Sequence, residues 1–297
     1  MDRFQQMQVF STVVEVGSFA GAAEALELSP AAVSRQIAAL ETRLGVRLLQ
    51  RTTRRLSLTP EGEVFLERAR QLLESLSEAE AEISEHSVEV MGRLRINAPV
   101  SYGLTHLAPL WGGFLEQHPR LKLDITLSDR SVDLVEEGYD LAIRIGKLGD
   151  SSLIARRLAT TRLVLCASPD YLQRHGRPEA PKDLVEHRIW SYSYFRLGDE
   201  WRFDGPEGEV SVRLRPVLHS NNGDTCRMGA VQGHAVVLQP GFLVEGDLKE
   251  GRLVELLPDY RAGELGVFAL YPSRRHVAPK LRLMVEYLTG ALGGRVC

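Results

Sequence analysis

The sequence is poor in cysteine and has no long uninterrupted apolar run. Its three cysteines, Cys166, Cys226 and Cys297, are far apart and odd in number, which indicates neither a disulfide framework nor the paired spacing of a zinc site. No apolar stretch approaches the length that spans a membrane, and no basic segment followed by an apolar core opens the chain. We therefore expect free thiols in a cytoplasmic protein that has no membrane partner.

Motifs typical of enzymes and metal sites are also absent. The sequence contains no phosphate-binding glycine loop, no HExxH pair and no nucleophile elbow, and its eight histidines show no metal-ligand spacing. We predict no catalytic residues, no metal ion and no cofactor. An enzyme whose catalytic groups are scattered along the chain is the first alternative.

The chain does contain enough residues for several cores, and its charge changes abruptly. Its 297 residues, 44% of them hydrophobic, suffice for two or more compact units. Residues 1–59 carry seven arginines against five acids, whereas residues 60–90 carry two arginines against nine glutamates. This change predicts a domain boundary near residue 59.

The most informative stretch, residues 28–37, reads as a recognition helix. Ser29 is a good N-cap, and Pro30 suits the first helical position, where no amide donor is needed. Apolar side chains recur on one face of this helix, which leaves small, polar and basic residues on the other. Such a face suits close approach to bases and phosphates in a DNA major groove. The predicted DNA contacts of the helix are Ser29, Pro30, Ala31, Ser34 and Arg35.

The segments on either side support this interpretation. Residues 18–26 are rich in alanine and predict a short helix, joined to the recognition helix by a tight turn as a helix-turn-helix. Residues 55–59 alternate as a strand, with a hairpin at 52–53. Six arginines and one acid lie between residues 29 and 55, a charge that favours phosphate binding. An amphipathic hairpin that serves only as a packing unit is the alternative. The remaining predicted DNA contacts are Arg51, Arg54 and Arg55.

These residues resemble the N-terminal signature of the LysR-type transcriptional regulators. The motif residues are Gly17, Ser18, Phe19, Ala22, Ala23, Leu26, Ser29, Ala32, Val33, Ser34, Gln36, Ile37, Leu40, Glu41, Leu44, Gly45, Arg51, Arg54, Leu58 and Thr59. Departures are Pro30, where many members have glutamine, and Leu49, where phenylalanine is usual. The resemblance implies a winged helix-turn-helix at residues 1–59, an interrupted palindromic operator on double-stranded DNA, and a dimer or tetramer of the chain.

A long helix is predicted next, at residues 60–91. Thr59 is its expected cap, and no glycine interrupts residues 63–91. Apolar residues follow the heptad spacing of a coiled-coil seam, and the flanking glutamates make an antiparallel pair electrostatically easier. We predict a dimerisation helix, which the family resemblance also implies; the alternative is that the apolar stripe docks on its own domain. The predicted seam is Phe65, Ala69, Leu72, Leu76, Ala79 and Ile83.

From residue 92 the pattern alternates between strands and helices, so that the protein as a whole is α/β. The order predicts a parallel sheet covered by helices. We expect two lobes with a cleft between them, lobe I at about 92–161 and 266–297 and lobe II at about 162–265. Residues 92–297 resemble the type 2 periplasmic-binding-protein architecture of the LysR-type regulatory domain. Expected strands are 93–98, 121–127, 140–145, 163–167, 210–217, 235–238 and 265–271, and expected helices 102–117, 131–137, 169–175, 223–232 and 279–292.

Ligands of open α/β sheets bind beyond the carboxyl ends of strands, near helix N-termini that favour anions. The residues at these junctions are the predicted effector contacts, and similar positions line the effector cleft in the family. The alternatives are an ordinary helix cap at Ser101 and a turn at 221–222. The contacts are Ser101, Ser128, Asn221, Asn222 and Gly223.

Two further groups have open roles. Arg144 either neutralises a ligand carboxylate or forms a structural ion pair. An aromatic segment either walls the pocket of an aromatic effector or serves packing; it comprises Trp190, Tyr192, Tyr194, Phe195 and Trp201. The sequence thus predicts a DNA-binding transcriptional regulator controlled by a small anionic organic acid. A solute-binding protein, the remaining alternative, leaves the arginine-rich hairpin unexplained.

Overall fold

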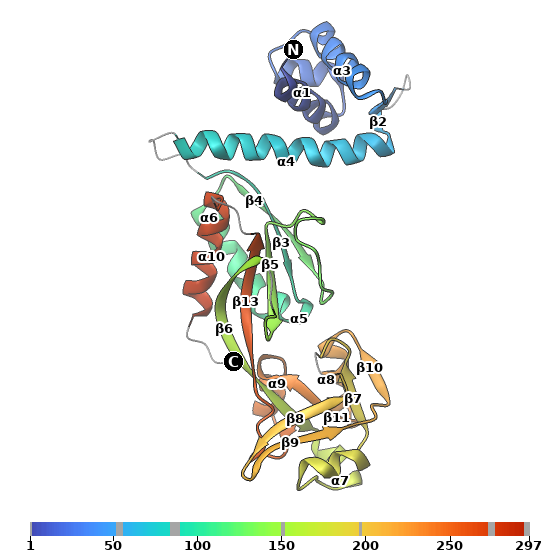
Figure 1. The fold of residues 1–297 in the computed structure, drawn as a ribbon, viewed down its shortest axis with the longest axis vertical. Helices are drawn as coiled ribbons and strands as arrows, with labels where there is room; N and C mark the ends of the chain where they lie inside the picture. The colour runs from blue at the N-terminus through green and yellow to red at the C-terminus, as the bar shows by residue number, and fades with distance from the viewer. Residues whose placement is uncertain are drawn as a thin grey trace. The chain divides into compact units, whose positions relative to one another are not determined.

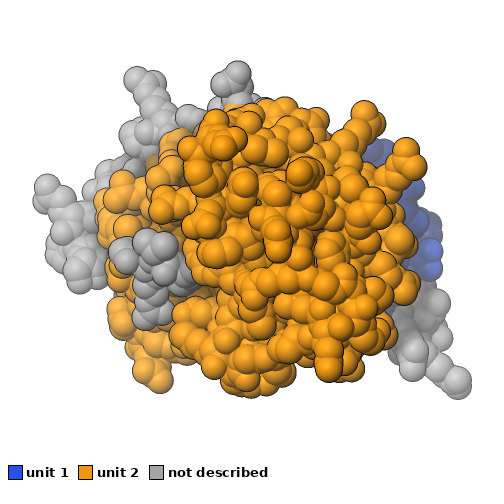
Figure 2. Space-filling model, turned by 90° about the horizontal axis from the view of Figure 1, so that it is seen from below, with its two compact units in different colours: residues 1–88 blue, residues 89–297 orange. Residues whose placement is uncertain are grey.

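The computed structural model describes residues 2–51, 56–83, 90–149, 152–195, 198–272 and 277–293. The chain forms two compact units, residues 1–88 and 89–297 (Figure 2). In the part of the chain that is described, no helix combines the length and apolar character needed to cross a membrane.

Three helices and their caps build the N-terminal unit (Figure 1): α1 (Arg3–Val16), α2 (Phe19–Ala25) and α3 (Pro30–Leu44). The predicted caps are confirmed, because the Ser18 hydroxyl accepts from the Gly21 amide at 3.0 Å and the Ser29 hydroxyl from the Ala32 amide at 3.2 Å. The apolar face of α3 is buried, as expected, in a core shared by all three helices. This core contains Val9, Phe10, Val13, Ala22, Ala23, Val33, Ile37, Leu40, Leu48, Leu49 and Leu66.

A small hairpin and a long helix complete this unit. Strands β1 (Leu49–Arg51) and β2 (Leu56–Leu58) pair antiparallel, and α4 (Pro60–Ile83) follows. The Thr59 hydroxyl accepts from the Gly62 amide at 2.9 Å and donates to the Arg47 carbonyl at 2.7 Å, so the cap of α4 also anchors the hairpin. The predicted hairpin residues 52–53 lie outside the described residues. Helix α4 does not reach residue 91 as predicted, because residues 90 and 91 are not helical and β3 begins directly after them.

Lobe I of the C-terminal unit is a sheet covered by helices. Strand β3 pairs parallel with β4 and β5, whereas β13 pairs antiparallel with both β5 and β6, so the sheet is mixed rather than parallel. Helices α6 and α10 lie side by side on one face (Figure 1). The strands are β3 (Gly92–Ala98), β4 (Leu121–Leu127), β5 (Leu141–Gly146), β6 (Leu153–Ala167) and β13 (Glu264–Pro272); the helices are α5 (Val100–Tyr102), a π-helix (Gly103–Leu107), α6 (Ala108–Gln117) and α10 (Pro279–Leu292).

Lobe II continues from the second half of β6. That half pairs antiparallel with β11 and β12, while the first half pairs with β13 in lobe I, so one strand belongs to both lobes. The strands are β7 (Ile189–Tyr192), β8 (Glu200–Gly205), β9 (Gly208–Arg213), β10 (Leu218–Ser220), β11 (Val236–Pro240) and β12 (Val254–Glu255); the helices are α7 (Pro169–His175), a 3-10 helix (Pro181–Glu186), α8 (Gly223–Val231) and α9 (Gly241–Lys249).

The predicted α/β class and two-lobed architecture are confirmed, but several elements differ. The predicted helix 131–137 is reduced to one turn at residues 134–138: the Asp133 carboxylate caps its start by accepting from the Val135 and Glu136 amides, and Gly138, at φ 71°, ends it. The predicted helix 102–117 is interrupted by the π-helix, and the predicted strand 210–217 ends at Arg213. Helix α9 was not predicted, since it begins at a glycine directly after a proline.

Candidate functional site

The outer face of α3 presents the residues predicted to read DNA. Ser29, Pro30, Ala31 and Arg35 are exposed, and Ser34 is half-buried. The Ser29 hydroxyl already accepts from the Ala32 amide as the helix cap. A contact of Ser29 with DNA would therefore be made from the exposed start of the helix. Of the three arginines predicted in the hairpin, Arg51 is described only as part of strand β1, and Arg54 and Arg55 lie outside the described residues.

The single acid of this basic stretch has a structural role that the sequence did not suggest. The Glu41 carboxylate accepts from the backbone amides of Leu48 at 2.9 Å and Leu49 at 3.1 Å. It therefore ties the end of α3 to the start of β1. The arginines of this stretch whose side chains are described, Arg35, Arg43 and Arg47, are exposed, whereas the Glu41 carboxylate is bound to the backbone.

The predicted seam of α4 divides into two parts. Ala69 is fully buried, and the Phe65 ring lies 5.5 Å from the Phe10 ring in an edge contact, so both pack on their own unit as the alternative predicted. Leu72 is 49% exposed and Leu76 is half-buried, which leaves the middle of the seam accessible to a partner. The side chains of Ala79 and Ile83 lie outside the described residues.

A cavity of about 680 Å³ lies between the lobes of the C-terminal unit. Three predicted effector residues line it: Ser101, Ser128 and Gly223. Asn222 instead caps α8, where its side-chain oxygen accepts from the Thr225 amide at 3.1 Å, and Asn221 is exposed. The cavity size is typical of sites for small organic ligands.

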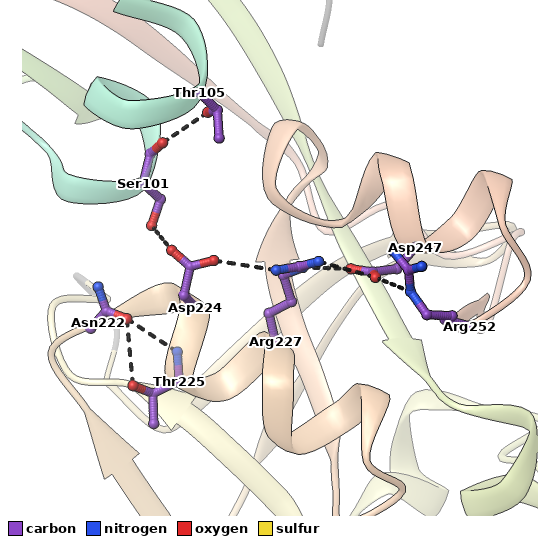
Figure 3. Close-up of polar contacts among 8 residues, drawn as sticks. All are labelled: Ser101, Thr105, Asn222, Asp224, Thr225, Arg227, Asp247 and Arg252. Carbon is purple, nitrogen blue, oxygen red and sulfur yellow. Dashed lines mark hydrogen bonds and ion pairs between the residues drawn. The ribbon is translucent and has the colours of Figure 1, made fainter. Parts of the chain in front are cut away.

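Ser101 connects the two lobes rather than capping a helix. Its hydroxyl donates to the Asp224 carboxylate, at the start of α8, over 2.5 Å (Figure 3). Asp224 lies 3.5 Å from the Arg227 guanidinium, and Arg227 binds the buried Asp247, which also binds Arg252. The chain of polar contacts in Figure 3 thus extends from Ser101 in lobe I through the charged residues of lobe II to its interior. Asp224 was missed because it is 123 positions from Ser101.

A second contact between the lobes is aromatic. The Tyr102 ring stacks on the His106 ring at 4.6 Å, and the Phe242 ring meets these two rings edge-on at 5.1 and 5.5 Å. Phe242 is the second residue of α9 in lobe II, and it also lines the cavity. The Ser101 bond and this ring cluster hold the lobes together beside the cavity.

Two charged residues in the cavity wall differ in how their charge is matched. Burial raises the pKa of Asp129, and hydrogen bonds from the Val100 amide and the Asn222 side chain oppose that rise. Burial lowers the pKa of Arg144, whose guanidinium donates to the Ile143 carbonyl and the Asn97 side-chain oxygen, each at 2.7 Å. Among the described residues no carboxylate forms an ion pair with Arg144. The predicted structural ion pair is therefore not found there.

The aromatic segment divides between packing and the cavity wall. Trp190 packs against α8, where a Cβ added at Gly229 would lie 2.0 Å from its ring. Tyr192, Tyr194, Phe195 and Trp201 line the cavity. Burial raises the pKa of the Tyr192 hydroxyl, which therefore stays neutral.

The two thiols in the described part of the chain are shielded from solvent. Cys166 and Cys226 are both buried, and burial raises their pKa to about 12 and about 11, respectively. Within the described ranges, no group of three or more histidine, cysteine, aspartate or glutamate side chains could hold a metal ion.

Comparison with known proteins identifies both units. A family model described as a bacterial regulatory helix-turn-helix protein of the lysR family matches residues 4–63, and the LysR substrate binding domain matches residues 88–293. The chain is 37% identical to the uncharacterised HTH-type transcriptional regulator YhjC of Escherichia coli, over 98% of both chains. It is 35% identical to the HTH-type transcriptional regulator CrgA of Neisseria meningitidis serogroup B, covering 99% of this chain and 98% of that protein.

Solved structures agree with these matches. The structure of CrgA, a LysR-type transcriptional regulator from Neisseria meningitidis, has a TM-score of 0.63 at 35% identity, covering 98% of this chain and 99% of that one. Full-length AphB, a virulence activator of Vibrio cholerae, has a TM-score of 0.61 at 29% identity, covering 97% and 99%.

Proposed function

Because the chain belongs to the LysR family of DNA-binding transcriptional regulators, we propose that α3 and the β1–β2 hairpin read an interrupted palindromic operator, under the control of a small organic acid bound in the cavity. The family regulates transcription and is not enzymatic, so the enzyme alternative is set aside. The domain division 1–59, 60–91 and 92–297 and a cytoplasmic location belong to the same proposal.

The outer face of α3 supports the DNA-reading part of this proposal. Val33, Ile37 and Leu40 hold the helix in the core from one side, which leaves the other side exposed over its first two turns. Small side chains there permit close approach to a groove, while Ser34 and Arg35 carry donors that can reach base edges. Contacts of the arginines to phosphates would position the helix without reading sequence.

We expect Ser34→Ala and Arg35→Ala each to cost about 1 to 3 kcal/mol of operator binding and to reduce the preference over random DNA, because lost base contacts lower specificity. Arg54→Ala should instead weaken binding to all sequences alike and flatten the salt dependence. Fluorescence anisotropy with operator and random duplexes, at several salt concentrations, measures both effects. The matched control is Arg282→Ala, at an exposed position on α10. Equal losses on the two duplexes for Arg35→Ala would show that α3 only positions the protein.

The accessible middle of α4 supports a dimer through this helix. Leu72→Arg should separate the two chains, because pairing would bury an arginine in an apolar contact. The single chain should keep its fold, since Leu72 is 49% exposed in it. Light scattering measures the mass, with Val64→Arg, 67% exposed on the same helix, as the control that remains dimeric. An unchanged dimer of the Leu72→Arg protein would contradict this assignment.

Arg144 carries the proposal that the effector is an acid. Its guanidinium is half-buried and forms no ion pair in the described part of the chain. A negatively charged ligand group placed beside it would therefore be stabilised by charge-assisted hydrogen bonds. Ser101, Ser128 and the first turn of α8 at Gly223 lie in the same cavity wall and offer hydroxyl and amide donors. An effector carboxylate could also take the Ser101 hydroxyl in place of Asp224. Binding would then change the contact between the lobes and so favour one relative arrangement of them.

A further inference from the structure

Glu41, in the last turn of α3, is an acid at a position where electrostatics oppose one. The carbonyl end of a helix carries partial negative charge and favours a cation, which Arg43 of the same turn provides. A negative charge within the basic stretch 29–55 also repels the phosphates that its arginines are expected to bind. Charge therefore does not explain a glutamate here, and we look for its role in its hydrogen bonds.

One oxygen of Glu41 binds the start of the β1–β2 hairpin. Its Oε1 accepts from the Leu48 amide at 2.9 Å and from the Leu49 amide at 3.1 Å. Leu48 and Leu49 are 1% and 2% exposed, so an amide that lost this acceptor would have little access to water. Gly45 ends α3 in the left-handed conformation, at φ 73°, and redirects the chain. Glu41 therefore closes the connection between α3 and the hairpin.

The other side of Leu48 is fixed by the start of α4. The Leu48 carbonyl accepts from the Thr59 amide at 3.0 Å, and a Cβ at Gly62 would lie 2.1 Å from the same oxygen. The base of the hairpin is thus held by α4 on one side and by the Glu41 carboxylate of α3 on the other. The second attachment fixes the hairpin relative to the helix that carries the predicted base contacts.

Resting on the proposed function, in which α3 and the hairpin contact one operator, we propose that Glu41 is a positioning residue for DNA binding. It holds the hairpin in the place where phosphate contacts of Arg51 and base contacts of Arg35 are made together. The acceptor oxygen performs this role, and the charge does not. Contacts held ready in one geometry bind without a further cost of ordering, so loss of the attachment reduces the benefit of the hairpin contact and leaves that of α3.

Two substitutions separate the oxygen from the charge. Glu41→Gln keeps an acceptor in the place of Oε1 and removes the charge, so operator binding should stay within about twofold of the wild type or become tighter. Glu41→Asp keeps the charge but withdraws the carboxylate by one methylene, so binding should weaken about tenfold, equivalent to 1.4 kcal/mol. Glu15→Asp, at an exposed position on α1, is the matched control that binds as the wild type does.

Fluorescence anisotropy of the full-length protein measures these affinities. The probe is a duplex that the wild-type protein selects from a random-sequence library. Stoichiometric titration supplies the fraction of active protein, so that partial unfolding of a variant is not counted as weak binding.

A double-mutant cycle in the same assay tests positioning itself. The factor by which Arg51→Ala weakens binding should be at least about threefold smaller in Glu41→Asp than in the wild type, whereas the factor for Arg35→Ala should be the same in both. Equal factors for Arg51→Ala, coupling to Arg35 as large as to Arg51, Glu41→Gln as weak as Glu41→Asp, or wild-type affinity of Glu41→Asp would each overturn the role of Glu41. An Arg51→Ala protein that binds as tightly as the wild type would instead overturn the hairpin contact of the proposed function, and the role of Glu41 with it.

Discussion

Replacing Asp247 with alanine is expected to destabilise the C-terminal unit by about 1.5 to 3 kcal/mol, because it removes charge-assisted hydrogen bonds to two partly exposed arginines. Asp247 lies on α9 and is 1% exposed. Its carboxylate accepts from the Arg227 guanidinium at 2.5 and 3.1 Å and from the Arg252 guanidinium at 2.7 Å. It thus joins α8, α9 and the segment after α9, and its loss would leave two cations without their shared anion (Figure 3).

Urea unfolding of the wild type and Asp247→Ala measures this loss. Asp247→Asn should cost less, since it keeps the shape of the side chain and one acceptor oxygen. The control is Asp259→Ala, an exposed aspartate in the same lobe, for which a change within about 0.5 kcal/mol is expected. A loss of less than about 1 kcal/mol for Asp247→Ala would show that the arginines are hydrated as well without it.

The same carboxylate makes the stability of this unit depend on pH. Burial acts to raise the pKa of Asp247, but hydrogen bonds from Arg227 and Arg252 outweigh it and hold the pKa below its ordinary value. A depressed folded-state pKa contributes stability that is complete above the unfolded pKa and is lost as the pH falls through the folded one. The stability difference between wild type and Asp247→Asn should therefore be constant near neutral pH and shrink below about pH 4.

Gly62→Ala is expected to have the second large effect, a loss of about 3 kcal/mol or more in the N-terminal unit. A Cβ at this position of α4 would lie 2.1 Å from the backbone oxygen of Leu48. That oxygen also accepts from the Thr59 amide at 3.0 Å, so it belongs to the anchor between hairpin and helix and has little freedom to move. The variant must displace the β1–β2 hairpin, and operator binding should fall with stability.

Thermal unfolding and the anisotropy assay together measure this effect. Gly290→Ala is the matched control, because a Cβ at that position of α10 meets no atom within 4 Å. That control should gain up to about 1 kcal/mol, since alanine is the better helix former. A Gly62→Ala protein as stable as the wild type would show that the hairpin can move away at no cost.

By itself the sequence determined the features that depend on neighbouring residues. Ser18, Ser29 and Thr59 each accept a bond from an amide three positions ahead, and such caps can be recognised without knowledge of the fold. The predicted limits of β4, α7 and α10 agree closely with the structure for the same reason, because periodicity and cap residues mark both ends. The family signature adds the function, since its residues lie in one continuous stretch.

Only the tertiary structure decided which side chains meet across the cavity. The Ser101 hydroxyl donates to Asp224, 123 positions away. The Arg144 guanidinium donates to the side-chain oxygen of Asn97, 47 positions away on a neighbouring strand. Packing also divided the α4 seam, because Ala69 is buried by its own unit while Leu72 remains exposed. Such properties depend on the arrangement of distant segments, which local propensity does not specify.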